Sequence, residues 1–72
     1  MGQPLRIGII GVGNISSQYL ANIPKLSSLQ LIAVADINLE RANEVAQVNN
    51  LKSMTVDEML ESAEIDAILN LT

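Results

Sequence analysis

Four short apolar runs follow one another along the chain, separated by stretches of mixed polarity. Leu5–Ile10 and Leu29–Ala35 are almost wholly apolar, and the first ends in glycines. Short apolar runs bounded by glycine are typical of strands buried on both faces of a parallel sheet. Residues 51–54 predict a weaker third strand and residues 65–71 a fourth.

Between the first two runs, apolar residues recur at the spacing of a helix. Their polar neighbours include Ser17, Gln18 and Asn22. Pro24 is expected to close or kink this helix, because its ring disfavours helical backbone at the residue before it. The apolar face consists of Ile15, Tyr19, Leu20 and Ile23.

Two further helices are predicted by capping residues. Asn38 can cap a second helix through its side chain. Thr55 and Glu58 have the spacing of a capping box that opens a third, short helix, in which Met59 and Leu60 are expected to be buried. The buried face of the second helix is predicted to contain Ala42, Val45, Ala46 and Asn49.

The predicted order is therefore strand–helix–strand–helix–strand–helix–strand. This alternation is typical of an α/β fold, in which right-handed helical crossovers join the strands of a parallel sheet. With 72 residues, the chain is at most one small domain.

The sequence Gly11-x-Gly13-x-x-Ser16 lies where the first strand turns into a helix. In a dinucleotide-binding loop, the first glycine allows a tight turn, the second lets a pyrophosphate approach the backbone, and the third position requires a small residue. Ser16 departs from the usual glycine or alanine but is small. The N–H groups of Asn14 and Ile15 are expected to point at the phosphates from the helix N-terminus. Glycines also serve ordinary turns, but the position between strand and helix favours the phosphate interpretation.

Asp36 ends the second strand, 20 residues after Ser16. A carboxylate at this position accepts hydrogen bonds from the adenosine ribose; alternatively, Asp36 starts a turn before Asn38. A carboxylate here repels a 2′-phosphate, so NAD is predicted in preference to NADP. Arg41 is either a cation that turns toward a phosphate or the adenine ring, or a solvated surface charge.

Asn70 and Thr72 end the fourth strand. In open parallel sheets, ligands bind beyond the carboxyl ends of the strands, where the strand order reverses. The first and fourth strands are expected to flank that point. Thr72 is therefore predicted to touch the cofactor and Asn70 to hydrogen-bond nearby, with ordinary strand-end polarity as the alternative.

Composition narrows the classes of partner and chemistry. The net charge of −4 argues against a nucleic-acid or anionic-membrane partner, since either requires a basic surface. No apolar run is long enough to span a bilayer, and a cytoplasmic location is expected. Without cysteine, neither disulfides nor thiolate zinc sites can form, and without histidine the usual acid–base groups are scarce. No catalytic or metal-ligating residue is predicted.

Residues 7–16, 33–36, 41–42 and 65–72 together resemble the Gfo/Idh/MocA oxidoreductases, which include glucose–fructose oxidoreductase, inositol dehydrogenase and rhizopine catabolism proteins. The resemblance covers nearly the whole chain. Many dehydrogenases share the glycine loop. Its combination with Ala35-Asp36, Arg41-Ala42 and the closing Asn-Leu-Thr is more specific.

The resemblance implies a Rossmann-type sheet and an NAD(P)-dependent oxidoreductase acting on a sugar or cyclic polyol. In this family a carboxy-terminal α/β domain binds the substrate and forms the oligomer interface. The family's catalytic His and its Glu-Lys-Pro lysine follow the fourth and fifth strands, and no counterpart occurs here. Residues 1–72 are therefore expected to be a truncated first half of the NAD(P)-binding domain, inactive alone, from a homo-oligomeric parent. The cofactor contacts implied are Gly11, Gly13, Asn14, Ile15, Asp36, Ile37, Arg41 and Thr72.

Two alternatives stay open from the sequence. A non-catalytic module that senses a nucleotide explains the missing catalytic residues, but it does not explain an unprotected apolar edge strand. A fold that binds S-adenosylmethionine also places an acid after the second strand. Such folds tend to have a denser glycine pattern, and residues 13–16 fit a pyrophosphate better.

Overall fold

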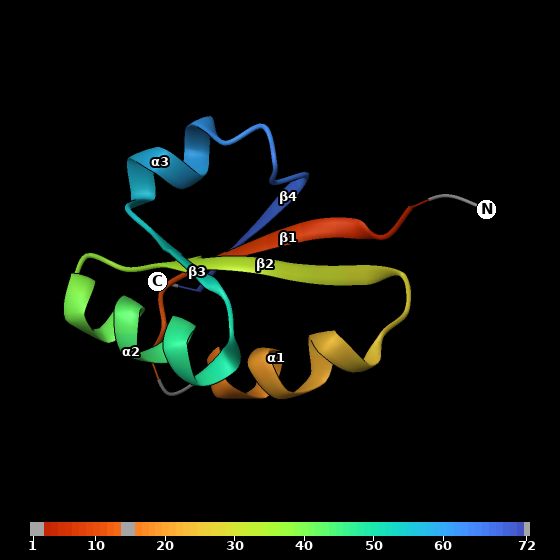
Figure 1. The fold of residues 1–72 in the computed structure, drawn as a ribbon, viewed down its shortest axis with the longest axis horizontal. Coiled ribbons are helices and arrows are strands. Elements are labelled where there is room, and N and C mark those ends of the chain that lie inside the picture. The colour runs from red at the N-terminus through yellow and green to blue at the C-terminus, as the bar shows by residue number, and fades with distance from the viewer. Residues whose placement is uncertain (1–2, 14–15, 72) are drawn as a thin grey trace.

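The computed structural model describes residues 3–13 and 16–71. Within them a parallel sheet has the strand order β3-β2-β1-β4, with helices on both faces (Figure 1). None of the helices in this part of the chain is long and apolar enough to cross a membrane. In chain order the elements are β1 (Leu5–Ile10), α1 (Ser16–Asn22), the 3-10 helix η1 (Ile23–Lys25), β2 (Leu29–Ala35), α2 (Leu39–Asn49), β3 (Lys52–Met54), α3 (Val56–Glu61) and β4 (Ala67–Asn70).

The predicted fold class and the bounds of β1 and β2 are confirmed. The third strand begins at Lys52 rather than residue 51, because the N–H of Leu51 bonds to the Ala46 carbonyl at 2.7 Å and so belongs to the end of α2. The turn that precedes it uses Asn50, whose backbone is left-handed with φ of 58°. Pro24 lies in η1, directly after α1, so the predicted break of the first helix is confirmed.

The sheet separates two apolar clusters. Helices α1 and α2 lie on one side of the sheet and α3 on the other (Figure 1). Ile7, Ile9 and Val34 are buried toward α1, η1 and α2, whereas Ile10 and Ala35 are buried toward α3. Alternate residues of each strand therefore point to opposite faces of the sheet. Because both faces are covered by helices, both central strands are continuously apolar in sequence.

A bulge in β2 interrupts this alternation. Ile7 of β1 pairs with Leu31, but Gly8 pairs with Ala33, so Ile32 is one extra residue on the β2 side. Leu31 packs with the cluster beneath α1 and α2, while Ile32 and Ala33 both belong to the α3 side. A uniformly apolar run contains no signal for such a bulge, and the sequence did not predict it.

Gly8 lies beneath Met59 of α3. A Cβ built on Gly8 would stand 2.8 Å from the Met59 Sδ atom and 2.9 Å from its Cε atom. The Met59 side chain is only 1% exposed, so it has little room to withdraw. Glycine at this position is therefore required by the packing of α3 on the sheet.

The predicted caps are confirmed, but three burial predictions are wrong. The Asn38 side chain accepts the Arg41 N–H, and the Thr55 capping box forms in both directions. Leu60 is 63% exposed, because neighbouring residues of a helix point in different directions and Met59 occupies the core position. Asn49 and Tyr19 are also exposed. The amide of Asn49 donates back to the Val45 carbonyl at 2.8 Å instead of packing.

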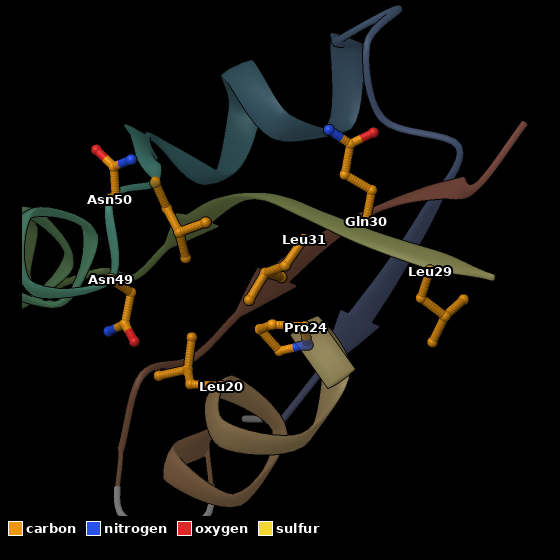
Figure 2. Close-up of a pocket in the computed structure, with 8 residues that line it drawn as sticks. Leu20, Pro24, Leu29, Gln30, Leu31, Asn49 and Asn50 are labelled. Carbon is orange, nitrogen blue, oxygen red and sulfur yellow. The ribbon is translucent and has the colours of Figure 1, made fainter. Parts of the chain in front are cut away.

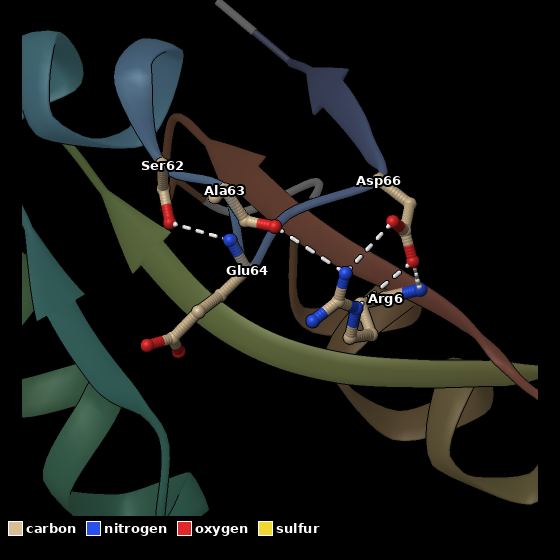
Figure 3. A network of polar contacts seen from close by, with 5 residues as sticks. All are labelled: Arg6, Ser62, Ala63, Glu64 and Asp66. Atoms are coloured by element: carbon tan, nitrogen blue, oxygen red, sulfur yellow. Dashed lines mark hydrogen bonds and ion pairs between the residues drawn. The ribbon is translucent and has the colours of Figure 1, made fainter.

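An ion pair fixes β4 to β1 near the amino end of β1. The Arg6 guanidinium donates to both carboxylate oxygens of Asp66, at 3.0 and 3.1 Å, and to the Ala63 carbonyl at 3.3 Å (Figure 3). Nearby, Lys52 pairs with Glu64 at 2.7 Å. Asp66 and Glu64 lie in the segment between α3 and β4 and join it to the sheet, a role that the sequence did not predict.

Candidate cofactor site

The glycine loop leaves β1 through a turn that requires its first glycine. Gly11 has φ of 94°, in the left-handed region that residues with a Cβ rarely adopt. Its N–H donates to the Ala35 carbonyl at 2.8 Å, which extends the pairing of β1 with β2 by one bond. The predicted tight turn is therefore present, and it is anchored to the end of the neighbouring strand.

Gly13 is exposed, and a Cβ built on it meets no other heavy atom within 4 Å. Its φ is not in the left-handed region. Neither backbone conformation nor packing within the described chain therefore demands glycine here. Open space beside a residue that has no side chain is what the close approach of a pyrophosphate needs. The predicted contacts Asn14, Ile15 and Thr72 lie outside the described residues.

Asp36 lies against the glycine loop, at the carboxyl end of β2. One carboxylate oxygen accepts the Val12 N–H at 2.9 Å, and the other accepts the Asn38 N–H at 2.8 Å. The hydrogen bond from the Val12 N–H, and after it the one from the Asn38 N–H, hold the pKa of Asp36 below its ordinary value. The side chain is therefore a carboxylate at neutral pH.

Ile37 and Arg41 follow Asp36 in the sequence, before and within the first turn of α2. Ile37 is 90% exposed and offers an apolar surface next to the carboxylate. Arg41 is exposed in the first turn of α2, and within residues 3–13 and 16–71 its guanidinium has no hydrogen bond or ion pair. Its charge contributes, as the last of four influences, to the lowered pKa of Asp36. An exposed apolar side chain and an exposed cation thus follow the carboxylate closely in the sequence.

The parallel register brings these residues together. Ile10 pairs with Ala35 on one side and with Asn70 on the other, so the carboxyl ends of β2, β1 and β4 lie next to each other. The Leu71 N–H continues this edge by donating to the Ile10 carbonyl at 2.8 Å. The order β2-β1-β4 places β1 at the point where the chain's course across the sheet reverses, as predicted.

Val12 is a part of the site that the sequence did not single out. Its side chain is buried among Ile9, Ile23 and Val34, and its N–H is the loop's bond to Asp36. In the sequence, Val12 is an aliphatic residue between two glycines, at a motif position where many residue types occur. The sequence therefore contains no indication of its contacts.

Pockets also occur away from the glycine loop on the part of the chain that the structure describes. One, of about 320 Å³, lies where Leu20, Pro24 and Leu31 gather between α1, η1 and β2 (Figure 2). A second, of about 480 Å³, lies over Tyr19 and Leu69. Neither is lined by a predicted cofactor residue or by a cation that could meet a diphosphate. The strand ends at the glycine loop remain the better candidate, because they combine exposed backbone with a charged side chain.

Comparison with known proteins agrees with this geometry. The sequence profile described as "Oxidoreductase family, NAD-binding Rossmann fold" matches residues 5–71. The chain belongs to the Gfo/Idh/MocA oxidoreductase family. Among curated relatives, the myo-inositol 2-dehydrogenase of Thermotoga maritima is 28% identical over 67 residues, which cover 90% of this chain and 20% of the relative.

Solved structures that superpose on this chain have the same fold. A myo-inositol dehydrogenase from Corynebacterium glutamicum superposes with a TM-score of 0.84 at 31% identity, over 96% of this chain and 21% of that protein. KijD10, a 3-ketoreductase from Actinomadura kijaniata solved with NADP and TDP-benzene, superposes with a TM-score of 0.82 at 22% identity. The superposition covers 90% of this chain and 21% of KijD10. The chain thus spans about one fifth of the length of these relatives.

Proposed function

We propose that this chain is the first part of the dinucleotide-binding domain of an NAD(P)-dependent oxidoreductase that moves a hydride to or from a sugar or cyclic polyol. The observation that carries the proposal is Gly13: it lies in open space, one residue from a backbone N–H held by an ionised Asp36. Membership of an NAD-binding oxidoreductase family supports the same assignment.

NAD is the proposed cofactor in preference to NADP. Asp36 is a carboxylate at neutral pH, and each of its oxygens retains a lone pair that a ribose hydroxyl can approach. The same negative charge opposes a 2′-phosphate. Arg41 is a feature that favours NADP, and the fold is compatible with NADP, since KijD10 was solved with it. The carboxylate is hydrogen-bonded to the glycine loop at 2.9 Å, and this position supports NAD.

The residues present fit the binding half of the reaction. The nicotinamide supplies the hydride chemistry when it is bound, and the protein's part is to hold and orient the dinucleotide. Gly11, Gly13, Asn14 and Ile15 are proposed to hold the pyrophosphate, and Asp36, Ile37 and Arg41 the adenosine. Thr72 is proposed to lie toward the nicotinamide side. No catalytic residue is assigned within the 72 residues.

The substrate class rests on the relatives. The two myo-inositol dehydrogenases, at 28% and 31% identity, act on a cyclic polyol, and a sugar-like alcohol is therefore the proposed substrate. Substrate binding and subunit assembly are assigned to the remaining length that the relatives have. A cytoplasmic, homo-oligomeric parent protein stays part of this proposal.

Titration calorimetry with NADH, NADPH and S-adenosylmethionine tests the proposal. NADH is expected to bind most tightly. Gly13→Ala should weaken NADH binding by at least about tenfold, since the added methyl group occupies the space next to the backbone. Gln47→Ala, an exposed change on α2, is the control and should leave binding unchanged. Preferential binding of S-adenosylmethionine, or a Gly13→Ala variant that binds NADH normally, would refute the assignment.

A further inference from the structure

The Asp36 carboxylate accepts backbone hydrogen bonds from two segments of its own chain, the glycine loop and the turn after β2. We propose that Asp36 is a positioning residue that fixes the shape of the glycine loop, so that it controls pyrophosphate binding as well as ribose recognition. This inference rests on the proposed function and deepens it, because it assigns to one side chain two separable effects on the cofactor.

The geometry joins the glycine loop to the turn that follows β2. Gly11 donates to the Ala35 carbonyl at 2.8 Å, and the next residue, Val12, donates to the Asp36 carboxylate at 2.9 Å. Two consecutive amides of the loop are thus held by two consecutive residues of the neighbouring segment. The second carboxylate oxygen accepts the Asn38 N–H at 2.8 Å, so one side chain bridges both turns.

Val12 makes this bridge rigid on the loop side. Its side chain is only 5% exposed and is packed in the core beneath α1 and α2. Its N–H is therefore fixed between a packed side chain and a charged acceptor. Hydrogen bonds to an ionised acceptor are stronger than neutral ones, so the carboxylate is the best available partner for this amide. The loop then continues directly into exposed Gly13.

The bridge has a consequence for cofactor preference. A variant without the Asp36 carboxylate loses the repulsion of a 2′-phosphate, but it also loses the bridge between the Val12 and Asn38 amides. It should therefore bind both NADH and NADPH weakly instead of exchanging one preference for the other. In Asp36→Asn, an NH₂ group replaces one carboxylate oxygen. Because this group cannot accept a hydrogen bond, either the Val12 N–H or the Asn38 N–H loses its partner.

The decisive probe is an NADH analogue whose adenosine ribose lacks both hydroxyls. Such a ligand keeps the pyrophosphate but cannot hydrogen-bond to Asp36 through the ribose. Asp36→Asn is expected to weaken the binding of both NADH and the analogue, each by at least about tenfold. Asp57→Asn removes an exposed charge from α3 and serves as the matched control, with binding unchanged. If Asp36→Asn weakens NADH alone and leaves the analogue unaffected, the positioning role is refuted.

A second measurement does not depend on the ligand or on the folding of a variant. In an acid titration of the wild-type chain followed by ¹⁵N NMR, the amide protons of Val12 and Asn38 should shift together, with a midpoint below the ordinary aspartate range. If the two amides titrate separately or not at all, the bridge is refuted. If they titrate together but wild-type chain binds neither NADH nor the analogue, the proposed function fails while the bridge between the loops stands.

Discussion

Replacing Gly8 by alanine tests how α3 packs on the sheet. The new Cβ would lie 2.8, 2.9 and 3.3 Å from the Sδ, Cε and Cγ atoms of Met59. These contacts are too close, and the methionine is 1% exposed, so it must change rotamer inside a filled space. Overpacking of this kind costs about 1–3 kcal/mol. Alanine in a strand regains about 0.5–1 kcal/mol relative to glycine, so the expected net loss is about 1–2 kcal/mol.

Urea unfolding followed by circular dichroism measures this loss, and a double-mutant cycle assigns it to Met59. Met59→Ala alone should cost about 2–5 kcal/mol because it leaves a cavity. In that background Gly8→Ala should become neutral or stabilising, since its methyl group enters vacated space. Gly13→Ala, with no atom nearby, is the matched control and should change the free energy of unfolding by at most about 1 kcal/mol. An equal cost of Gly8→Ala in both backgrounds would refute the packing argument.

Three smaller effects are expected. The folded-state pKa values of Asp36 and Asp66 lie below their ordinary values, so their ionised forms stabilise the fold above about pH 4. This stabilisation is lost as the pH falls through the folded pKa values; urea midpoints at pH 7 and pH 3 should show the decrease, and Asp36→Asn should reduce it. Thr55→Ala should cost about 1 kcal/mol through loss of the capping box, with Thr55→Ser near neutral in the same assay. Leu60→Ala should change the free energy of unfolding by less than about 0.5 kcal/mol, and a loss as large as that of Met59→Ala would contradict its exposed position.

The strand–helix alternation could be predicted because its signals are local. β1 and β2 are apolar runs with clear ends, and the caps at Asn38 and Thr55 depend on residues no more than three positions away. Burial within the helices was less predictable. Leu60 and Met59 are neighbours of similar hydrophobicity, and only the position of α3 over Gly8 decides which of them reaches the core.

The position of the candidate site was also predictable, but its internal contacts were not. The glycine spacing and Asp36 indicated the strand ends that the structure brings together. The bond from Val12 to Asp36 joins residues 24 positions apart, and it depends on backbone direction that no side-chain pattern encodes. The bulge at Ile32 and the pairing of Arg6 with Asp66 are likewise set by the register between strands.

The central claim is that a nicotinamide dinucleotide binds at the carboxyl ends of β1 and β2. An NADH titration of the ¹⁵N-labelled chain tests it most directly, because each backbone amide reports separately. Saturable shifts are expected at Gly11, Val12, Gly13 and Asp36, while Arg6, at the opposite end of β1, should stay unchanged. Shifts centred on Arg6, or no saturable shift at the glycine loop, would contradict the account.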